Sequence, residues 1–143
     1  MVEHVGACHC GSVRFAFDSA APMLVRECQC SFCRKHGSRN VSDPDGSARI
    51  VADKPLLRYR FGLGITDFLM CSECGCYVAA AMRDGGSWRA TFNLNCFDDP
   101  HVDLAAEPVV YDAEDTGDRI ARRLLKWTPT QIEAPEPGAE PRT

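Results

Sequence analysis

The sequence lacks an apolar run long enough to cross a membrane, and its first residues do not resemble an export signal. Residues 1–17 lack a basic start followed by an apolar stretch, because charged or small residues interrupt each apolar run. We therefore expect a cytoplasmic protein without a membrane partner. Disulfides rarely persist in a reducing cytoplasm, so cysteines there more often bind metal.

The sequence also lacks a surplus of basic residues. It has 16 Lys and Arg against 20 Asp and Glu, a formal net charge of −4. This balance argues against nucleic acid as a partner, because phosphate backbones attract basic surfaces. The basic run Arg119–Lys126 follows the acidic residues Glu114, Asp115 and Asp118. We interpret it as a solvated helix face.

Short apolar runs broken by glycine, proline and acidic residues fill most of the chain. In residues 12–18, Val13, Phe15 and Phe17 alternate with other residues, as in a strand with one buried face. This pattern predicts a mainly β domain with strands at Val13–Phe17, Met23–Glu27, Leu56–Phe61, Asp67–Cys71, Tyr77–Met82 and Trp88–Leu94. Seven aromatic residues of these strands are expected in the core rather than in a substrate pocket: Phe15, Phe17, Tyr59, Phe61, Phe68, Trp88 and Phe92.

Three further segments complete the prediction. Residues 39–47 have turn chemistry and almost no apolar residue, which predicts an exposed loop. Ile120, Leu124 and Trp127 follow acidic residues at helical spacing, which predicts one short C-terminal helix over residues 115–127. Residues 129–143 are rich in Pro, Glu, Ala and Gly, so we expect a disordered tail after a domain of residues 1–128.

Nine cysteines are the strongest chemical signal, and an odd number fits poorly with complete disulfide pairing. Seven of them form three clusters, a CxC at Cys8 and Cys10, a CxCxxC at Cys28, Cys30 and Cys33, and a CxxC at Cys71 and Cys74. Cys76 and Cys96 belong to no pair with metal spacing and are predicted to be buried free thiols.

The spacing predicts two zinc sites of different kinds. Two cysteine pairs far apart in the chain, Cys8 with Cys10 and Cys71 with Cys74, can complete a closed four-sulfur structural site. The middle cluster, Cys28, Cys30 and Cys33, has three thiolates, the pattern of a catalytic zinc with one position for water or substrate. The alternative is a second closed site in which His36, three residues after Cys33, supplies the fourth ligand.

At these clusters the chain resembles the glutathione-dependent formaldehyde-activating enzyme family, which includes centromere protein V-like proteins. The resemblance rests on three segments, GACHCG at residues 6–11, CQCSFCRK at 28–35 and FLMCSECG at 68–75, and extends from residue 6 to about residue 98. It implies a Mss4-like fold of folded antiparallel β-sheets clamped by zinc. It also implies a structural zinc on Cys8, Cys10, Cys71 and Cys74 and a catalytic zinc on Cys28, Cys30 and Cys33.

The resemblance further implies a carbon-sulfur lyase activity, the reversible addition of a glutathione-like thiol to a small aldehyde such as formaldehyde. Zinc can lower the pKa of a thiol or polarise a carbonyl, and three thiolate ligands favour an exchangeable fourth ligand. Arg34, Lys35 or Arg39 can balance the thiolate charge or hold a substrate carboxylate. Exposed, solubilising charges are the other interpretation of these three residues.

Two other functions fit the same cysteines. One is a zinc-stabilised binding module without catalysis, which a closed four-ligand middle site would favour. The other is a thiol sensor in which oxidation of the middle cluster expels zinc. An open three-cysteine site favours the enzyme.

Overall fold

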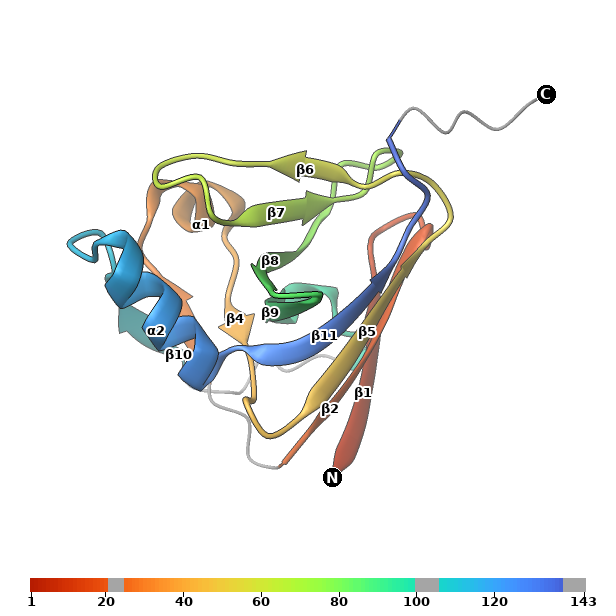
Figure 1. Ribbon diagram of the computed structural model, residues 1–143. Helices are drawn as coiled ribbons and strands as arrows, with labels where there is room; N and C mark the ends of the chain where they lie inside the picture. The colour runs from red at the N-terminus through yellow and green to blue at the C-terminus, as the bar shows by residue number, and fades with distance from the viewer. Residues whose placement is uncertain (21–24, 100–105, 138–143) are drawn as a thin grey trace.

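The computed structural model describes residues 1–20, 25–99 and 106–137, and over these residues the chain is predominantly β-structure (Figure 1). The first strands are β1 (Val2–Ala7), β2 (Val13–Ser19), β3 (Val25–Cys28), β4 (Asn40–Val41), β5 (Ser47–Ala52) and β6 (Leu57–Tyr59). The later ones are β7 (Asp67–Met70), β8 (Tyr77–Asp84), β9 (Ser87–Asn93), β10 (Ala106–Val109) and β11 (Thr128–Glu133). The helical segments are α1 (Ser31–His36), the 3₁₀ turn η1 (Leu94–Cys96) and α2 (Thr116–Lys126).

The strands described form one sheet of eleven strands that folds over on itself. Its main path runs β1-β2-β5-β11-β9-β4-β3-β10, and β8, β7 and β6 continue in turn from β9. In Figure 1, β1, β2 and β5 make one wall, β6 and β7 lie across the top, and β8 and β9 lie between them. The expected Mss4-like, mainly β fold is confirmed. Two pairings, β10 with β3 and β11 with β5, are parallel rather than antiparallel.

Alternation in β2 creates the main core. Val13, Phe15 and Phe17 are buried while Arg14 between them is exposed. The ring of Phe15 lies 5.0 Å from that of Phe92 on β9, so β2 and β9 meet through aromatic contacts. In the middle of the fold, residues 77–82 of β8 are all buried, because β7 and β9 flank this strand.

Two sequence predictions about irregular segments are wrong. Residues 39–47 are not a simple exposed loop, because Asn40 and Val41 are buried as β4 between β3 and β9. The predicted disordered tail is wrong for residues 129–133, which belong to β11 between β5 and β9. The folded unit therefore extends beyond residue 128. Residues 138–143 of that tail, and Met23 and Leu24 of a predicted strand, lie outside the described residues.

The sequence did not predict β11, because the buried residues of this strand are polar. Thr128 and Thr130 are buried, and their hydroxyls are hydrogen-bonded. Thr128 Oγ1 accepts from the amide of Asp43 at 2.7 Å, and Thr130 Oγ1 donates to the carbonyl of Thr128 at 2.8 Å. Buried hydroxyls with partners are tolerated in a core, so a strand without apolar alternation can still be central.

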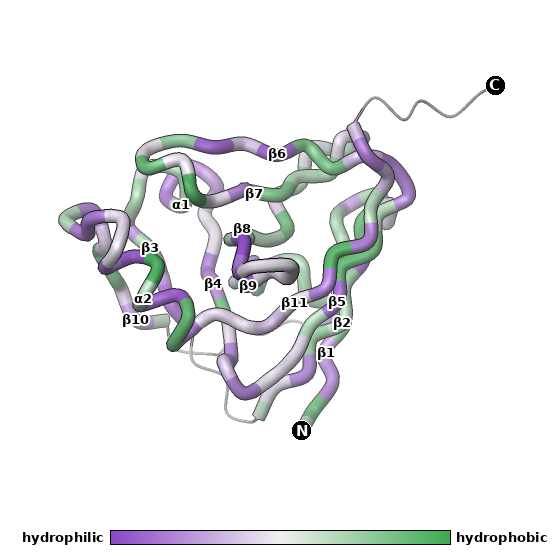
Figure 2. The backbone as a smooth tube through the Cα atoms, viewed as in Figure 1, coloured by the Kyte–Doolittle hydropathy of each residue, from purple (hydrophilic) through white to green (hydrophobic). Residues whose placement is uncertain are grey.

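The C-terminal helix forms as predicted, but its basic run is not a solvated face. Asp115 caps α2, its Oδ1 accepting from the amide of Asp118 at 2.7 Å. Hydrophilic and hydrophobic segments follow one another along α2 (Figure 2). Arg123 is only 6% exposed, whereas Leu125 is 70% exposed. None of the helices in the described part of the chain is long and apolar enough to cross a membrane.

Candidate metal centres and the adjoining cavity

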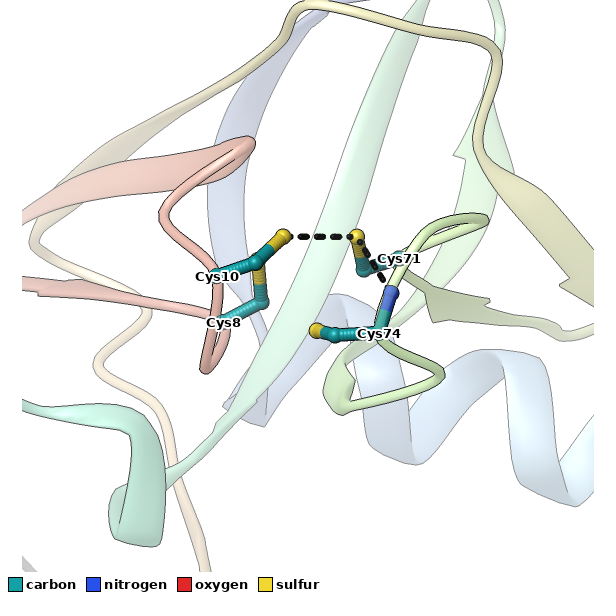
Figure 3. A group of neighbouring side chains, drawn as sticks. All are labelled: Cys8, Cys10, Cys71 and Cys74. Atoms are coloured by element: carbon teal, nitrogen blue, oxygen red, sulfur yellow. Dashed lines mark hydrogen bonds between the residues drawn. The ribbon is translucent and has the colours of Figure 1, made fainter.

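The first and third cysteine clusters meet across two loops. Cys8 and Cys10 lie in the turn between β1 and β2, and Cys71 and Cys74 in the turn between β7 and β8. Their side chains point toward one another (Figure 3), and all four sulfurs lie within 4.8 Å of one another. The Sγ atoms of Cys8 and Cys10 are 3.7 Å apart, and those of Cys10 and Cys71 are 3.6 Å apart.

This geometry fits a closed tetrahedral metal site. Zinc-sulfur bonds in a regular tetrahedron place two thiolates about 3.8 Å apart. The loops also aim backbone amides at the sulfurs, since Val13 N donates to Cys8 at 3.3 Å and Glu73 N donates to Cys71 at 3.3 Å. Gly11 and Gly75 follow the second cysteine of each pair with φ of 84° and 77°, a conformation that other residues rarely adopt.

The thiols of this cluster titrate unequally. Desolvation raises the pKa of Cys74, but hydrogen bonds from the backbone amides of Cys10 and Cys76 outweigh this effect and lower that pKa to about 6. The amide of Ser12 lowers the pKa of Cys10, but desolvation and the neighbouring thiols together raise it to about 12. Four thiolates this close repel one another, so full ionisation requires a cation among them.

The middle cluster forms a three-thiol group at the start of α1. Cys28 ends β3, Cys30 caps α1, and Cys33 lies in its first turn, with the three sulfurs within 4.8 Å of one another. The amide of Cys33 donates to Cys30 Sγ at 3.4 Å. Hydrogen bonds from the thiols of Cys28 and Cys33 lower the pKa of Cys30 to about 2, and the same crowding raises the pKa of Cys33. We call these residues the thiol triad.

His36 does not complete this group. Its Nδ1 lies 3.0 Å from the carbonyl oxygen of Phe32, and its ring stacks on that of Phe32 with the centroids 4.1 Å apart. Among the described His, Cys, Asp and Glu residues, only the three cysteines bring their ligand atoms together at the triad. The alternative of a closed site with His36 is therefore not the arrangement found. Asn40 Nδ2 contacts Cys33 Sγ at 3.7 Å and holds this thiol from the side of β4.

The triad opens onto a cavity of about 110 Å³. Its walls combine thiols, guanidinium groups and aromatic rings from β3, β8, α2 and the loop before β7. The lining residues are Arg26, Cys28, Cys30, Cys33, Asn40, Phe61, Thr66, Phe68, Tyr77, Ala80, Thr91, Val109, Tyr111, Asp112, Arg119, Arg122, Arg123 and Trp127.

Three buried polar atoms on the wall of this cavity have no hydrogen-bond partner among the described residues. They are Tyr77 OH, Asn40 Oδ1 and Arg123 Nε. Burial raises the pKa of Tyr77 well above its usual value, so its hydroxyl stays protonated and can donate. Buried polar groups in native proteins are nearly always satisfied, so unpartnered atoms on a cavity wall indicate a place for a ligand or water.

The positively charged residues at this site differ from those that the sequence suggested. Arg34 donates from Nε to the carbonyl of Gln29 at 3.0 Å, and Arg39 donates to Asn95 Oδ1 at 3.3 Å. Neither these two nor Lys35 lines the cavity beside the triad. The arginines on its wall come instead from β3 and α2.

The arginines of α2 are held in two ways. Glu114 accepts from Arg119 at 3.3 Å and from Arg122 at 2.8 Å. Arg123 lies over the Trp127 ring at 4.2 Å and donates to Thr66 Oγ1. Arg119, Arg122 and Arg123 are spaced at i, i+3 and i+4, so the sequence indicates that they share one face of the helix. It does not indicate that this face is turned toward the interior.

Expectations about other residues hold only in part. Tyr59 and Phe61, expected in the core, are 48% and 36% exposed, and Phe61 and Phe68 line the cavity. Cys76 and Cys96 are free thiols, as predicted, but only Cys96 is buried, whereas Cys76 is half-buried. Their Sγ atoms lie 3.6 Å apart.

Comparison with known proteins identifies a family and a similar solved structure. A family model described as glutathione-dependent formaldehyde-activating enzyme matches residues 3–113. Among solved structures, the chain is similar to a protein of Rhodobacter sphaeroides, with 26% sequence identity and a TM-score of 0.56. That match covers 75% of this chain and 99% of the other. The family match includes all seven clustered cysteines, whereas α2 and β11 lie beyond it.

Proposed function

The chain belongs to the glutathione-dependent formaldehyde-activating enzyme family, and on this premise we propose that it is a zinc-dependent carbon-sulfur lyase. It adds a glutathione-like thiol reversibly to a small aldehyde. The observation that carries the proposal is the contrast between the two cysteine groups. Four thiols close around one point, whereas the triad offers three and opens onto a cavity.

In this proposal Cys8, Cys10, Cys71 and Cys74 hold a structural zinc, and Cys28, Cys30 and Cys33 hold a catalytic one. Zinc at the triad would supply an exchangeable coordination position that favours the thiolate form of a substrate thiol at neutral pH. The open triad supports an enzyme over a binding module, because a purely structural site needs four protein ligands.

The remaining chemistry is assigned to residues of the cavity wall. As the thiol sulfur attacks the carbonyl carbon, the carbon-oxygen double bond becomes a single bond and negative charge develops on oxygen. The protonated hydroxyl of Tyr77 donates a hydrogen bond to that oxygen and stabilises the charge. The rings of Phe61 and Phe68 limit the access of water to the reacting atoms.

The proposed partners are small thiols and aldehydes rather than nucleic acid or a membrane. Fully reduced thiols at both sites suit a reducing compartment, so we propose a cytoplasmic location.

The test compares adduct formation by the wild type and by two serine variants. Exchange NMR with formaldehyde and glutathione measures how fast S-hydroxymethylglutathione forms and breaks down. The wild type should exceed the uncatalysed rate, Cys30→Ser should fall to that rate, and Cys76→Ser, which changes a thiol outside both groups, should retain activity. A wild-type rate equal to background with these substrates, or full activity in Cys30→Ser, would refute the proposal.

A further inference from the structure

More arginines than carboxylates line the cavity beside the thiol triad. Arg26 stands two residues before Cys28 on β3, so both side chains lie on one face of this strand. Arg119, Arg122 and Arg123 reach the same cavity from α2. The cavity thus joins a thiol group and a group of arginines from segments almost a hundred residues apart in the chain.

Two of these arginines have no carboxylate partner. Glu114 binds Arg119 and Arg122, but no ion pair is found for Arg26 or Arg123 among the described residues. Arg26 donates to the hydroxyl of Ser42, and the Nε atom of Arg123 has no partner there.

Burial makes this arrangement costly without a counterion. Arg123 is 6% exposed, and its desolvation, with the nearby charges of Arg122 and Arg119, lowers its pKa to about 9. A buried guanidinium normally has an anionic partner, because removing it from water costs several kcal/mol. The hydrogen bond to Thr66 and the contact with the Trp127 ring do not neutralise this charge.

The groups on the cavity wall give the sign of the missing partner. Among the described lining residues, four are arginines and only Asp112 has a carboxylate. Glu114 pairs with Arg119 and Arg122, and Glu107, which lies opposite Arg26 in the pairing of β10 with β3, is exposed. An anionic group in the cavity, such as a carboxylate, would therefore meet Arg26 and Arg123, which have no ion-pair partner among the described residues.

We propose that this cavity binds a carboxylate of the substrate, with Arg26 and Arg123 as its main ligands. The inference rests on the proposed function and specifies its substrate class: at least one reactant, the thiol or the carbonyl compound, is a small acid whose reacting atom reaches the triad. Planar guanidinium groups suit a carboxylate because they form two parallel hydrogen bonds with it.

Matched pairs of small probes test the proposal by isothermal titration calorimetry on the metal-loaded protein. The thiol pair is mercaptoacetate and 2-mercaptoethanol, and the carbonyl pair is glyoxylate and glycolaldehyde. Within each pair only the carboxylate is replaced by a neutral hydroxymethyl group. We expect the acid to bind at least roughly tenfold more tightly than its neutral twin in one pair or both, from charge-assisted hydrogen bonds. A preference in the thiol pair identifies the thiol as the acid, and one in the carbonyl pair identifies the carbonyl compound.

Variants test which arginines cause the preference for the acid over its neutral twin. Arg123→Gln and Arg26→Gln should each reduce it, whereas Arg34→Gln, which changes an arginine near the triad but off the cavity wall, should leave it intact. Equal affinity of the wild type for acid and neutral twins in both pairs would overturn the inference, and this comparison needs no variant to fold. Retention of the full preference in an Arg26→Gln, Arg123→Gln double variant would also overturn it.

The outcome is separable from that of the lyase proposal. Tight binding of the acids without accelerated adduct formation would support the carboxylate subsite and contradict the lyase. Accelerated formation of the formaldehyde adduct without any preference for acids would support the lyase and contradict the subsite.

Discussion

The hydroxyl of Tyr77 is buried on the cavity wall beside the thiol triad and has no hydrogen-bond partner among the described residues. Because its raised pKa keeps it protonated, it can donate a hydrogen bond to a group bound in the cavity. Its neighbour Asn40 is held to Cys33 by its amide nitrogen, which leaves the Oδ1 atom of Asn40 free as an acceptor. At the scale of single residues, these two atoms are what the proposed function adds to a group of metal-binding thiols.

Replacing Tyr77 by phenylalanine removes this donor and keeps the ring. If Tyr77 stabilises charge on the carbonyl oxygen, Tyr77→Phe should lower kcat by about a hundredfold with little change in KM. Steady-state kinetics of adduct formation measure both constants. Tyr59→Phe, at a half-exposed tyrosine, is the control and should behave as wild type. An unchanged kcat in Tyr77→Phe would remove this residue from the mechanism.

Among the elements, α2 shows most clearly what the sequence could and could not predict. Its bounds followed from the acidic residues at its start and from helical spacing, and the structure confirms them. Which face turns inward was not predictable, because Arg123 is buried through contacts with Thr66 and Trp127 that exist only in the folded chain.

The same contrast holds for the strands. Alternation identified β2, and uninterrupted apolar residues identified β8. β5 was missed because its buried alanines carry a weak apolar signal, and β11 because its buried residues are threonines. α1 was missed because six residues are too short for a periodic pattern.

The ion pairs of Glu114 make the attachment of α2 dependent on pH. Hydrogen bonds and charge from Arg122, with those from Arg119, lower the pKa of Glu114. Between this value and the usual glutamate pKa of 4.5, the unfolded chain binds more protons than the folded one. The stabilisation is therefore complete above the usual value and is lost as pH falls through the lowered one.

Urea unfolding between about pH 6 and about pH 3 should show this effect. The Glu114→Gln variant should lose less unfolding free energy over this range than the wild type, because it lacks the titrating group. Glu107→Gln, at an exposed position of β10, is the matched control and should follow the wild-type curve. Identical pH slopes for wild type and Glu114→Gln would mean that the ion pairs contribute nothing to stability.

For the whole molecule, the four-cysteine group joins two loops that are about sixty residues apart in sequence. If this group holds a metal, binding free energy contributes directly to folding. Cys71→Ser or Cys74→Ser should therefore cause a global loss of soluble protein, and a chelator should lower the melting temperature of the wild type. Cys30→Ser or Cys33→Ser should leave a folded, inactive protein. Equal solubility and equal melting temperatures in both sets of variants would contradict this division of roles.

The spacing of the cysteines sufficed to predict the composition of both groups, because CxC and CxxC are local patterns. It could not show the cavity, which depends on β3, β8 and α2 meeting in three dimensions. The arginines and Tyr77 were therefore beyond a sequence prediction, although each was present in the sequence as an ordinary core or surface residue.

The central claim, two metal sites of which one is open to substrate, is tested most directly by zinc content per chain. Elemental analysis of protein purified without chelator should give two zinc ions for the wild type. Cys30→Ser should give one, with an unfolding curve like that of the wild type. One zinc in the wild type, or two in Cys30→Ser, would contradict the assignment of the thiol triad as the second metal site.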